Sequence, residues 1–478
     1  MDANFCVLCS AGYPGSSIAG KVVEEQGVNY KMGQQVDVEK ETKKRTAVAT
    51  HTEIARMYWM RRMADTMYSR GQFYRYGEGV WEPIHDLLIS RELWRHLTAY
   101  EEKGVRPTRD VKNSVGDAIK AELFVPEDCL DANENLVNLA NGIYDLGTQT
   151  LLPHNPAQYL TTQLPFAYDS QAQAVTWQMY LMSTLVKPRS VEYDQELAEF
   201  VQEAVGYSLT TSVCHHCTFW CYGEGANGKG VLFHVLEQLG GTACVPLNIG
   251  LLSKEQYQLA DLAGKRIALC SETSASGPKS LIEDAYVKAL VGGDTMNVRQ
   301  IRKDPFVLRP TVHLWSSMNE LPAVADSSEG FWRRIMVIPF NRQFATNERI
   351  LDLKERLDAE LPGIFNWAME GLRHLRDRGR FVLPSQVAES TKQYRQDANP
   401  VALFIADECY EGKDLKEQSS VLYDAYKAWC YDNNYKPHSS RNFKHEMERL
   451  KCHHKPEAAH NVYLGVQLKV QVSKKDGK

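Results

Sequence analysis

A short glycine-rich segment constrains the fold of this chain more than any other feature. It reads Gly223-Glu224-Gly225-Ala226-Asn227-Gly228-Lys229-Gly230 and follows four apolar or aromatic residues, 219–222. After it, apolar residues recur at helical spacing from Val231 to Leu239. Glycines let successive backbone N–H groups turn toward phosphate oxygens, and a lysine can reach the outer phosphates of a nucleotide. The order strand, loop and helix therefore predicts a nucleotide phosphate-binding loop at a helix N-terminus.

One position of this segment departs from the usual phosphate loop. Ser or Thr usually follows the lysine and binds Mg²⁺, whereas this chain has Gly230. We therefore expect Mg²⁺ to rely more on water, on the phosphates and on a carboxylate further along the chain. The alternative is a glycine-rich turn with an incidental lysine, which the flanking strand and helix disfavour.

The residues around this loop predict a parallel α/β fold. Between Phe219 and Phe340, apolar strand-like stretches alternate with helical stretches, which is typical of a parallel sheet covered by helices. We expect one helix before this region, over Glu196–Leu209, and another after it, over Leu351–Arg376. The expected strands are Thr218–Tyr222, Cys244–Leu247, Arg266–Cys270, Val312–Ser316 and Ile335–Pro339.

Two polar residues follow predicted strands of this sheet. Glu272 comes after the apolar stretch 266–270, and a carboxylate there can orient Mg²⁺ or polarise an attacking water. In isolation it would be an ordinary solvated glutamate, but its position relative to the phosphate loop favours the functional role. Asn319 follows the strand that begins near Thr311, and its amide can hydrogen-bond a γ-phosphate or the water.

Two basic groups are further candidates. Residues 297–304 alternate apolar and basic side chains, so a short hairpin presenting Arg299, Arg302 and Lys303 would suit a nucleic-acid backbone. A solvated basic hairpin is the alternative. Arg333 and Arg334 precede the last expected strand, where adjacent arginines can stabilise transition-state charge on a neighbouring subunit's nucleotide. For these two, the alternative is a structural ion pair.

The C-terminal segment has a different pattern. Residues 422–429 and 440–450 each predict an amphipathic helix, and residues 462–472 alternate apolar with mostly polar side chains. From Arg441 to Lys478 there are nine Lys/Arg against four Asp/Glu. A helix, helix, strand order with a cationic surface predicts a winged helix, and a solvated basic tail is the alternative.

Composition limits the class without indicating chemistry. A chain of 478 residues is expected to hold two to four domains. Its net charge of −5 argues against a broadly basic coat for nucleic acid, although a basic channel or tail is still compatible with it. No apolar run approaches the roughly 20 residues that a membrane span needs, and the first residues lack a signal-peptide layout. With eleven cysteines and no secretion signal, we expect reduced thiols in a cytoplasm and no membrane partner.

Three cysteine-containing stretches have spacing that zinc sites also use. Cys6 and Cys9 form one pair, Cys214 and Cys217 another, and Cys452-His453-His454 could add ligands. No second half-site lies at a suitable interval, which disfavours zinc and leaves a zinc site as the alternative.

Together these residues resemble the superfamily 3 helicases, and most closely the phage and plasmid primase–helicase family of bacterial mobile elements. Residues 138–146 and 205–207 are similar to the domain that precedes the helicase in that family, and the resemblance covers residues 70–475. The remaining motifs occur in the family's order: Asn227-Gly228-Lys229, Ser271-Glu272, Gly292-Gly293-Asp294, Asn319 with Leu321-Pro322, and Gly330-Phe331-Trp332-Arg333-Arg334.

The resemblance implies an AAA+-like ATPase whose ATP and Mg²⁺ lie between the subunits of a ring, with a hexamer expected. By that resemblance Lys229 binds phosphate, Glu272 serves Mg²⁺ and water, and Asn319 senses the γ-phosphate. Arg333 or Arg334 would reach the neighbour's ATP. The basic hairpin would line the pore and pull single-stranded DNA in the 3′ to 5′ direction. Glycine after the loop lysine is an accepted variant in the family.

The same resemblance sets the expected domains and partners. Longer relatives carry a primase domain before the helicase, whereas little precedes residue 70 here, so we expect helicase without primase activity. Expected partners are single-stranded and forked DNA, further copies of the chain, and a primase or initiator protein. The predicted domains are an arm and helical region (1–70), a helicase-preceding mixed α/β domain (71–205), the ATPase core (206–345), a helical lid or linker (346–395) and the winged helix (396–478).

The leading hypothesis is therefore a ring-forming, ATP-dependent DNA helicase that replicates a phage, plasmid or genomic island in a bacterial host cell. One rival is a DNA-stimulated ATPase acting in packaging or defence. Another is a DNA-binding initiator whose nucleotide site only controls assembly. Strand displacement separates the first rival from a helicase, and a variant that assembles without hydrolysis separates the second.

Overall fold

The computed structural model describes residues 49–62, 65–248, 257–270, 284–301, 305–322, 329–433, 435, 437–456 and 460–469. Residues 1–48, which belong to the predicted arm and helical region (1–70) and include Cys6 and Cys9, lie outside the described residues. Glu272, Arg302 and Lys303 lie outside them as well, so their roles stay predictions.

A sheet of five parallel strands forms the centre of the protein, in the order β13-β7-β12-β9-β8. The predicted parallel sheet is therefore confirmed, and each expected strand is present within two residues of its predicted ends. The strands are β7 (Thr218–Tyr222), β8 (Cys244–Pro246), β9 (Ile267–Cys270), β12 (His313–Met318) and β13 (Ile335–Pro339).

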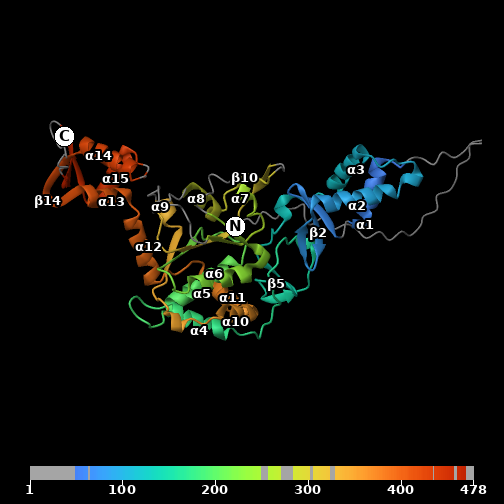
Figure 1. Cartoon of the computed structure of the whole chain (residues 1–478), viewed down its shortest axis with the longest axis horizontal. Helices are drawn as coiled ribbons and strands as arrows, with labels where there is room; N and C mark the ends of the chain where they lie inside the picture. The colour runs from blue at the N-terminus through green and yellow to red at the C-terminus, as the bar shows by residue number, and fades with distance from the viewer. Residues whose placement is uncertain are drawn as a thin grey trace, which may run out of the picture. The chain divides into compact units, whose positions relative to one another are not determined.

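Helices cover both faces of this sheet (Figure 1). Phe219 and Cys221 of β7 pack in one core cluster with α5, α6 and α11, whereas Trp220 packs in a second cluster with α8 and α12. Because both faces are buried, the strand reads as a continuous apolar run. The helices are α4 (Val175–Thr184), α5 (Gln195–Ser208), α6 (Lys229–Gly240), α7 (Tyr257–Ala260), α8 (Asp284–Gly292), α9 (Glu329–Trp332), α11 (Leu361–Arg378) and α12 (Ser385–Asp397).

The single helix predicted over Leu351–Arg376 is wrong, because two helices occupy this stretch. α10 spans Leu353–Ala359 and α11 begins at Leu361. Pro362 lies in the first turn of α11, where a proline costs no backbone hydrogen bond, whereas it would disrupt a continuous helix. At the break, the Glu360 carboxylate accepts hydrogen bonds from the backbone N–H groups of Thr176 (2.9 Å) and Trp177 (3.0 Å). Pro362 is the sequence signal for this break.

Helices α5 and α11 cross closely because glycine lies at their contact. A Cβ on Gly206 would lie 2.1 Å from the Ala368 carbonyl oxygen and 2.9 Å from the Leu372 nitrogen. These are backbone atoms of the facing helix, so they cannot move aside as a flexible side chain would. Gly206 belongs to the stretch 205–207 that resembles the family. The close helix contact gives this glycine a packing role.

We expect Gly206→Ala to destabilise the protein by about 1–3 kcal/mol or more, since overpacking outweighs the gain of about 1 kcal/mol in helix propensity. Urea unfolding without nucleotide measures this effect. Gly230→Ala is the matched control, because Gly230 is also helical and its Cβ would meet nothing within 4 Å. Equal stability of the two variants would contradict the close crossing of α5 and α11.

The N-terminal region is a smaller mixed α/β structure, as the sequence predicted. It contains two antiparallel sheets of three strands each, ordered β1-β2-β3 and β4-β5-β6. The strands are β1 (Thr66–Ser69), β2 (Gln72–Gly77), β3 (Val80–Pro83), β4 (Leu136–Leu139), β5 (Gly142–Asp145) and β6 (Thr150–Leu152). The helices are α1 (His51–Arg62), α2 (Asp86–Thr98) and α3 (Arg109–Glu122).

The C-terminal region combines three helices with an antiparallel sheet in the order β14-β16-β15. Its own core cluster includes Phe404, Tyr426 and Phe443. The two predicted helices and the last strand are present, while β14 and β15 were not predicted. The elements in chain order are α13 (Pro400–Glu408), β14 (Cys409–Gln418), α14 (Ser419–Asp432), α15 (Ser440–Arg449), β15 (His453–Pro456) and β16 (Asn461–Leu468).

Candidate nucleotide site

The glycine-rich loop lies at the carboxyl edge of the central sheet. It follows Tyr222, the last residue of β7, which is in register with Met318 at the end of β12. The Gly223 N–H donates to the Met318 carbonyl at 3.2 Å, so the loop begins against the neighbouring strand. Ligands of open α/β sheets bind at this edge, outside the carboxyl ends of the strands.

Two glycines allow the loop to fold as it does. Gly223 has a φ of 155°, and a Cβ there would lie 2.5 Å from both the Asn227 side-chain nitrogen and the Phe340 carbonyl oxygen. Gly228 has a φ of 90°, and its Cβ would lie 3.0 Å from Thr184. Positive φ and close neighbours both favour glycine, so the spacing seen in the sequence has a local physical cause.

Lys229 is the first residue of α6, and its side chain links two candidate residues of the site. Only 5% of Lys229 is exposed, and its Nζ donates to the Gly223 carbonyl and, at 3.0 Å, to the Asn319 Oδ1. Asn319 directly follows β12. The structure therefore brings Lys229 and Asn319 together from positions ninety residues apart in the chain.

The loop opens onto a cavity of about 1070 Å³. Residues 225–230 of the loop form one wall together with Ser317 and Asn319. A second wall of the cavity was not predicted from the sequence. It consists of Thr176, Met179, Tyr180, Ser183 and Thr184 from α4 and of Arg342, Phe344, Glu348, Arg349, Ile350, Leu353, Lys354 and Arg356 from the segment after β13.

Hydrogen bonds hold this second wall against the loop. The Tyr180 hydroxyl donates to the Gly228 carbonyl at 3.1 Å, and the Phe344 N–H donates to the Ala226 carbonyl at 2.8 Å. The Gln343 side chain donates to Glu224 at 2.8 Å. Tyr180, Gln343 and Phe344 belong to no motif, so only the tertiary structure reveals their place beside the loop.

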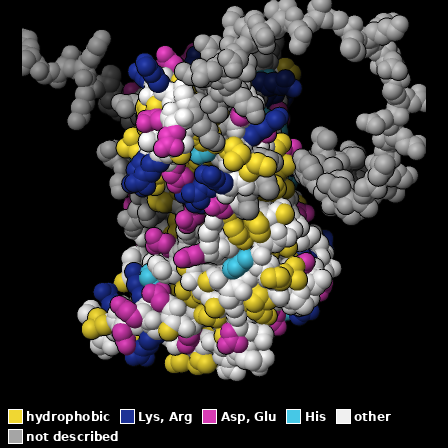
Figure 2. Space-filling view, turned by 90° about the vertical axis from the view of Figure 1, so that its right-hand side faces the viewer, with side chains coloured by type: hydrophobic (Ala, Val, Ile, Leu, Met, Phe, Trp, Pro, Cys, Tyr) yellow, Lys and Arg dark blue, Asp and Glu magenta, His cyan; other side chains and the backbone are white. Residues whose placement is uncertain are grey.

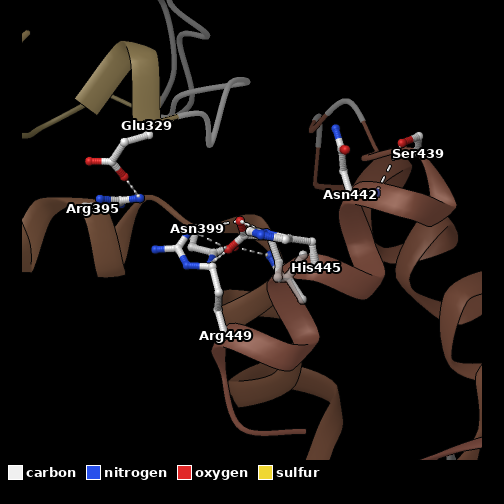
Figure 3. Close-up of polar contacts among 9 residues, drawn as sticks. Glu329, Arg395, Asn399, Ser439, Asn442, His445 and Arg449 are labelled. Carbon is white, nitrogen blue, oxygen red and sulfur yellow. Dashed lines mark hydrogen bonds and ion pairs between the residues drawn. The ribbon is translucent and has the colours of Figure 1, made fainter. Parts of the chain in front are cut away.

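Arg333 and Arg334 do not line this cavity. Arg334 is half-buried and its Nη1 donates to the Gly330 carbonyl, while burial and the neighbouring Arg333 lower the pKa of its guanidinium. Arg333 is exposed. Both follow α9, whose first residue, Glu329, forms an ion pair of 2.6 Å with Arg395 of α12 (Figure 3).

The predicted basic hairpin falls on two short antiparallel strands, β10 (Met296–Arg299) and β11 (Pro305–Leu308). Arg299 ends β10 and is exposed. The other two predicted DNA-binding residues lie in the connection between these strands, outside the described residues. Glu272 likewise follows β9, whose last residue, Cys270, is in register with Ser316 of β12.

The C-terminal helix α15 is held in place by a buried carboxylate. Glu446, 2% exposed, accepts hydrogen bonds from the Asn399 Nδ2 and the Arg449 Nη1, both at 2.9 Å (Figure 3). Asn399 also caps α13 by accepting from the Val401 N–H at 3.0 Å. Ser439 caps α15. The exposed polar residues of this helix include Arg441, Asn442, Lys444 and His445.

The cysteine pairs do not form a metal site among the described residues. No group of three or more His, Cys, Asp or Glu side chains there could hold a metal ion. Cys214 is exposed and Cys217 is buried, and both are free thiols. A hydrogen bond with His215 lowers the pKa of Cys214, whereas burial raises that of Cys217.

The face of the protein shown in Figure 2 carries no continuous patch of Lys and Arg side chains. Lys and Arg side chains are interspersed with Asp and Glu on the face in Figure 2. This agrees with the net charge of −5. In the described part of the chain, no helix has both the length and the apolar character needed to cross a membrane.

Gly230 is exposed in the first turn of α6, and a Cβ there would meet nothing within 4 Å. We therefore expect Gly230→Ser to fold normally and to supply the hydroxyl that phosphate loops usually offer to Mg²⁺. The Mg²⁺ concentration for half-maximal ATP hydrolysis should fall about tenfold, equivalent to about 1.4 kcal/mol. Gly230→Ala should leave that concentration unchanged. An equal Mg²⁺ requirement in the serine variant would show that the ion binds away from this position.

The fold and the cavity define an α/β protein with a candidate ligand site at the carboxyl edge of its parallel sheet. Residues 49–186 match the family described as "D5 N terminal like", residues 221–334 a family of unknown function (DUF5906), and residues 396–456 the "Poxvirus D5 protein-like" family. With the viral relatives below, these matches support the resemblance to the phage and viral primase–helicase family that its motifs predicted.

Two relatives are viral proteins named as helicases. "Putative helicase L207/L206" of Acanthamoeba polyphaga mimivirus is 25% identical over 332 residues, which is 64% of this chain and 34% of the relative. "Putative helicase 184R" of Invertebrate iridescent virus 6 is 23% identical over 365 residues, which is 68% of this chain and 37% of the relative. The chain thus spans about a third of the length of these relatives.

A solved structure also aligns with most of the chain. It is the apo C-terminal region of NrS-1, which is 10% identical and aligns over 87% of this chain and 99% of its own length. The TM-score is 0.45, a distant likeness that does not by itself establish a shared fold.

Proposed function

We propose that this protein is an ATP-dependent DNA helicase that serves replication of a phage or viral element. The observation that carries the proposal is the hydrogen bond between Lys229 and Asn319 in the lining of a large cavity, beside a glycine-rich loop. Helicase names among the relatives and the family matches support the same activity. An intracellular location and a bacterial host stay predictions from the sequence.

The cavity fits a nucleoside triphosphate. Backbone N–H groups of residues 225–230 stand at the N-terminus of a twelve-residue helix, where anions are stabilised. The charged side chains of the lining are Lys229, Arg342, Arg349, Lys354, Arg356 and one acid, Glu348. This excess of cations suits the negative charge of a triphosphate.

In the proposed reaction, Lys229 neutralises phosphate charge and Asn319 contacts the γ-phosphate or the attacking water. Glu272 would orient that water, as a carboxylate does in related phosphoryl transfers. Mg²⁺, held by Glu272, water and the phosphates, would supply electrostatic stabilisation of the phosphoryl oxygens. Asn319 and Ser317 are neutral oxygen donors in the described lining, which suits an ion that keeps several waters.

We further propose that the chain assembles into a ring, with a hexamer expected, and that Arg333 completes the neighbour's site. Its exposure and its absence from the cavity of its own chain favour action between subunits. Arg299, Arg302 and Lys303 would then contact single-stranded DNA in the ring's pore, moving in the 3′ to 5′ direction. An AAA+-like core of superfamily 3 accounts for all of these roles.

The C-terminal region is proposed to be a winged helix that binds duplex DNA or a replication partner such as a primase or initiator protein. Its order of helix, strand, two helices and two strands supports this proposal. α15 would enter the major groove with Arg441, Asn442 and Lys444, because these side chains are exposed while the carboxylate of Glu446 is buried.

A hydrolysis-deficient variant separates this proposal from an initiator whose nucleotide site only controls assembly. We expect Glu272→Gln to bind ATP and assemble normally but to hydrolyse it at least about a hundredfold more slowly. Native mass measurement with ATP and single-stranded DNA follows assembly, and phosphate release follows turnover. Normal replication of the element by a Glu272→Gln variant without turnover would favour the initiator.

A further inference from the structure

The cations of the nucleotide cavity are not equivalent, because three of them already have partners. Lys229 bonds to Gly223 and Asn319. Arg356 donates to Asp352 at 2.9 Å. Arg342 has three contacts, with Ser183, Glu348 and Phe344.

Arg342 anchors the wall of the cavity. One of its nitrogens donates to the Ser183 carbonyl at 3.0 Å, and another donates to the Glu348 carboxylate at 2.8 Å. Its guanidinium carbon also lies 4.6 Å from the centre of the Phe344 ring. Because Phe344 is bonded to the loop through Ala226, Arg342 fixes the start of this segment beside the phosphate loop.

Glu348 closes the next turn of the segment. It accepts from the Ala345 N–H at 2.8 Å as well as from Arg342, and its pKa is lowered by these two hydrogen bonds. The turn ends at residue 348, so Arg349 is the first residue after a segment that is fixed at both ends. Lys354 follows in the first turn of α10.

The side chains of Arg349 and Lys354 differ from the other cations in having no hydrogen bond or ion pair with another described residue. Both side chains are exposed, and both line the cavity. Two unneutralised cations in the same cavity as a phosphate-binding loop attract a polyanion, and their interaction strengthens as ligand and protein exclude water.

We infer that Arg349 and Lys354 bind the triphosphate of the nucleotide held by the loop of the same subunit. This inference rests on the proposed nucleotide site and adds two phosphate-binding residues to it. They would favour a triphosphate over a diphosphate, because the longer anion carries more charge into a site with two unneutralised cations. Arg342 has a different role, since it positions the segment.

Binding of ATP, ADP and inorganic tripolyphosphate to the full chain tests this inference by calorimetry. Each of Arg349→Ala and Lys354→Ala should weaken ATP and tripolyphosphate about tenfold, the effect of losing one charge-assisted hydrogen bond, and should weaken ADP less. Arg349→Lys should retain most of the affinity because it keeps the charge. The matched control is Lys120→Ala, which removes a cation that pairs with Asp117 at 2.9 Å outside the cavity lining and should leave the affinity unchanged.

The binding and strand-separation measurements distinguish failure of this inference from failure of the proposed helicase function. Unchanged ATP affinity in the Arg349→Ala/Lys354→Ala double variant overturns the inference, as does an equal loss for ATP and ADP. A wild-type chain that binds ATP through both residues yet separates no DNA strands contradicts the proposed helicase and supports the inference. A wild-type chain that binds neither ATP nor tripolyphosphate overturns both. Thermal unfolding without nucleotide should be the same for all variants, which excludes a structural cause.

Discussion

Replacing Lys229 with alanine is expected to weaken ATP binding and to abolish most of its hydrolysis. Lys229 stands at the N-terminus of α6 with its Nζ bonded to Asn319, so it is the cation nearest to both the loop and the candidate γ-phosphate contact. Loss of a charge-assisted contact of about 1.5–3 kcal/mol predicts a fall in ATP affinity of roughly ten- to a hundredfold, and a larger fall in turnover.

Titration with a fluorescent ATP analogue and phosphate release measure the two effects. Lys229 is buried and its Nζ donates to the Gly223 carbonyl. The alanine variant leaves this carbonyl without that partner, so the stability of the variant has to be measured as well. Lys229→Arg keeps the charge and serves as a second variant if alanine does not fold. Lys120→Ala is the matched control, because Lys120 is an exposed lysine paired with Asp117 far from the loop in sequence. Turnover of the folded alanine variant at the wild-type rate would rule out the proposed site.

Arg333→Ala is expected to retain ATP binding but to lose turnover by about 10³- to 10⁵-fold, the effect of removing an arginine that acts across a subunit boundary. The structure favours Arg333 over Arg334 for this role. Arg333 is exposed, whereas Arg334 is half-buried and bonded to the carbonyl of its own helical turn. Neither residue lines the cavity of its own chain.

Mixing two inactive variants tests whether the arginine acts in trans. In a ring that combines Arg333→Ala with Lys229→Ala subunits, an intact Lys229 site can face an intact Arg333 from its neighbour, so part of the activity should return. Arg334→Ala should instead lower stability and should not be rescued by mixing. If native mass measurement shows that mixed rings form but no activity returns, this would contradict the proposal that Arg333 acts between subunits.

Much of the central sheet could be predicted from the sequence because its signals are local. Each strand is a short apolar run, and the loop needs glycine at Gly223 and Gly228 for reasons of backbone conformation and close approach. Asn319 was found for the same kind of reason, since it follows a strand that neighbours the loop strand. Parallel packing then brings these positions to one edge.

The second wall of the cavity could not be predicted, because tertiary contacts alone create it. Tyr180 and Arg342 lie on opposite sides of the loop in sequence and belong to no motif, yet both contact the same cavity. The Tyr180 hydroxyl donates to the Gly228 carbonyl and one Arg342 nitrogen donates to the Ser183 carbonyl. Every residue has a backbone carbonyl, so such contacts leave no signature in the sequence. By contrast, Pro362 is a local sequence signal for the break before α11. A prediction from hydrophobic periodicity alone does not use this signal.

Strand displacement on a forked DNA substrate tests the central claim most directly. The account predicts that the wild-type chain separates the strands with ATP, does not do so with a non-hydrolysable analogue, and loses the activity on Lys229→Ala substitution. Vigorous ATP hydrolysis stimulated by DNA without displacement of a strand would contradict a helicase and would favour an ATPase that acts in packaging or defence.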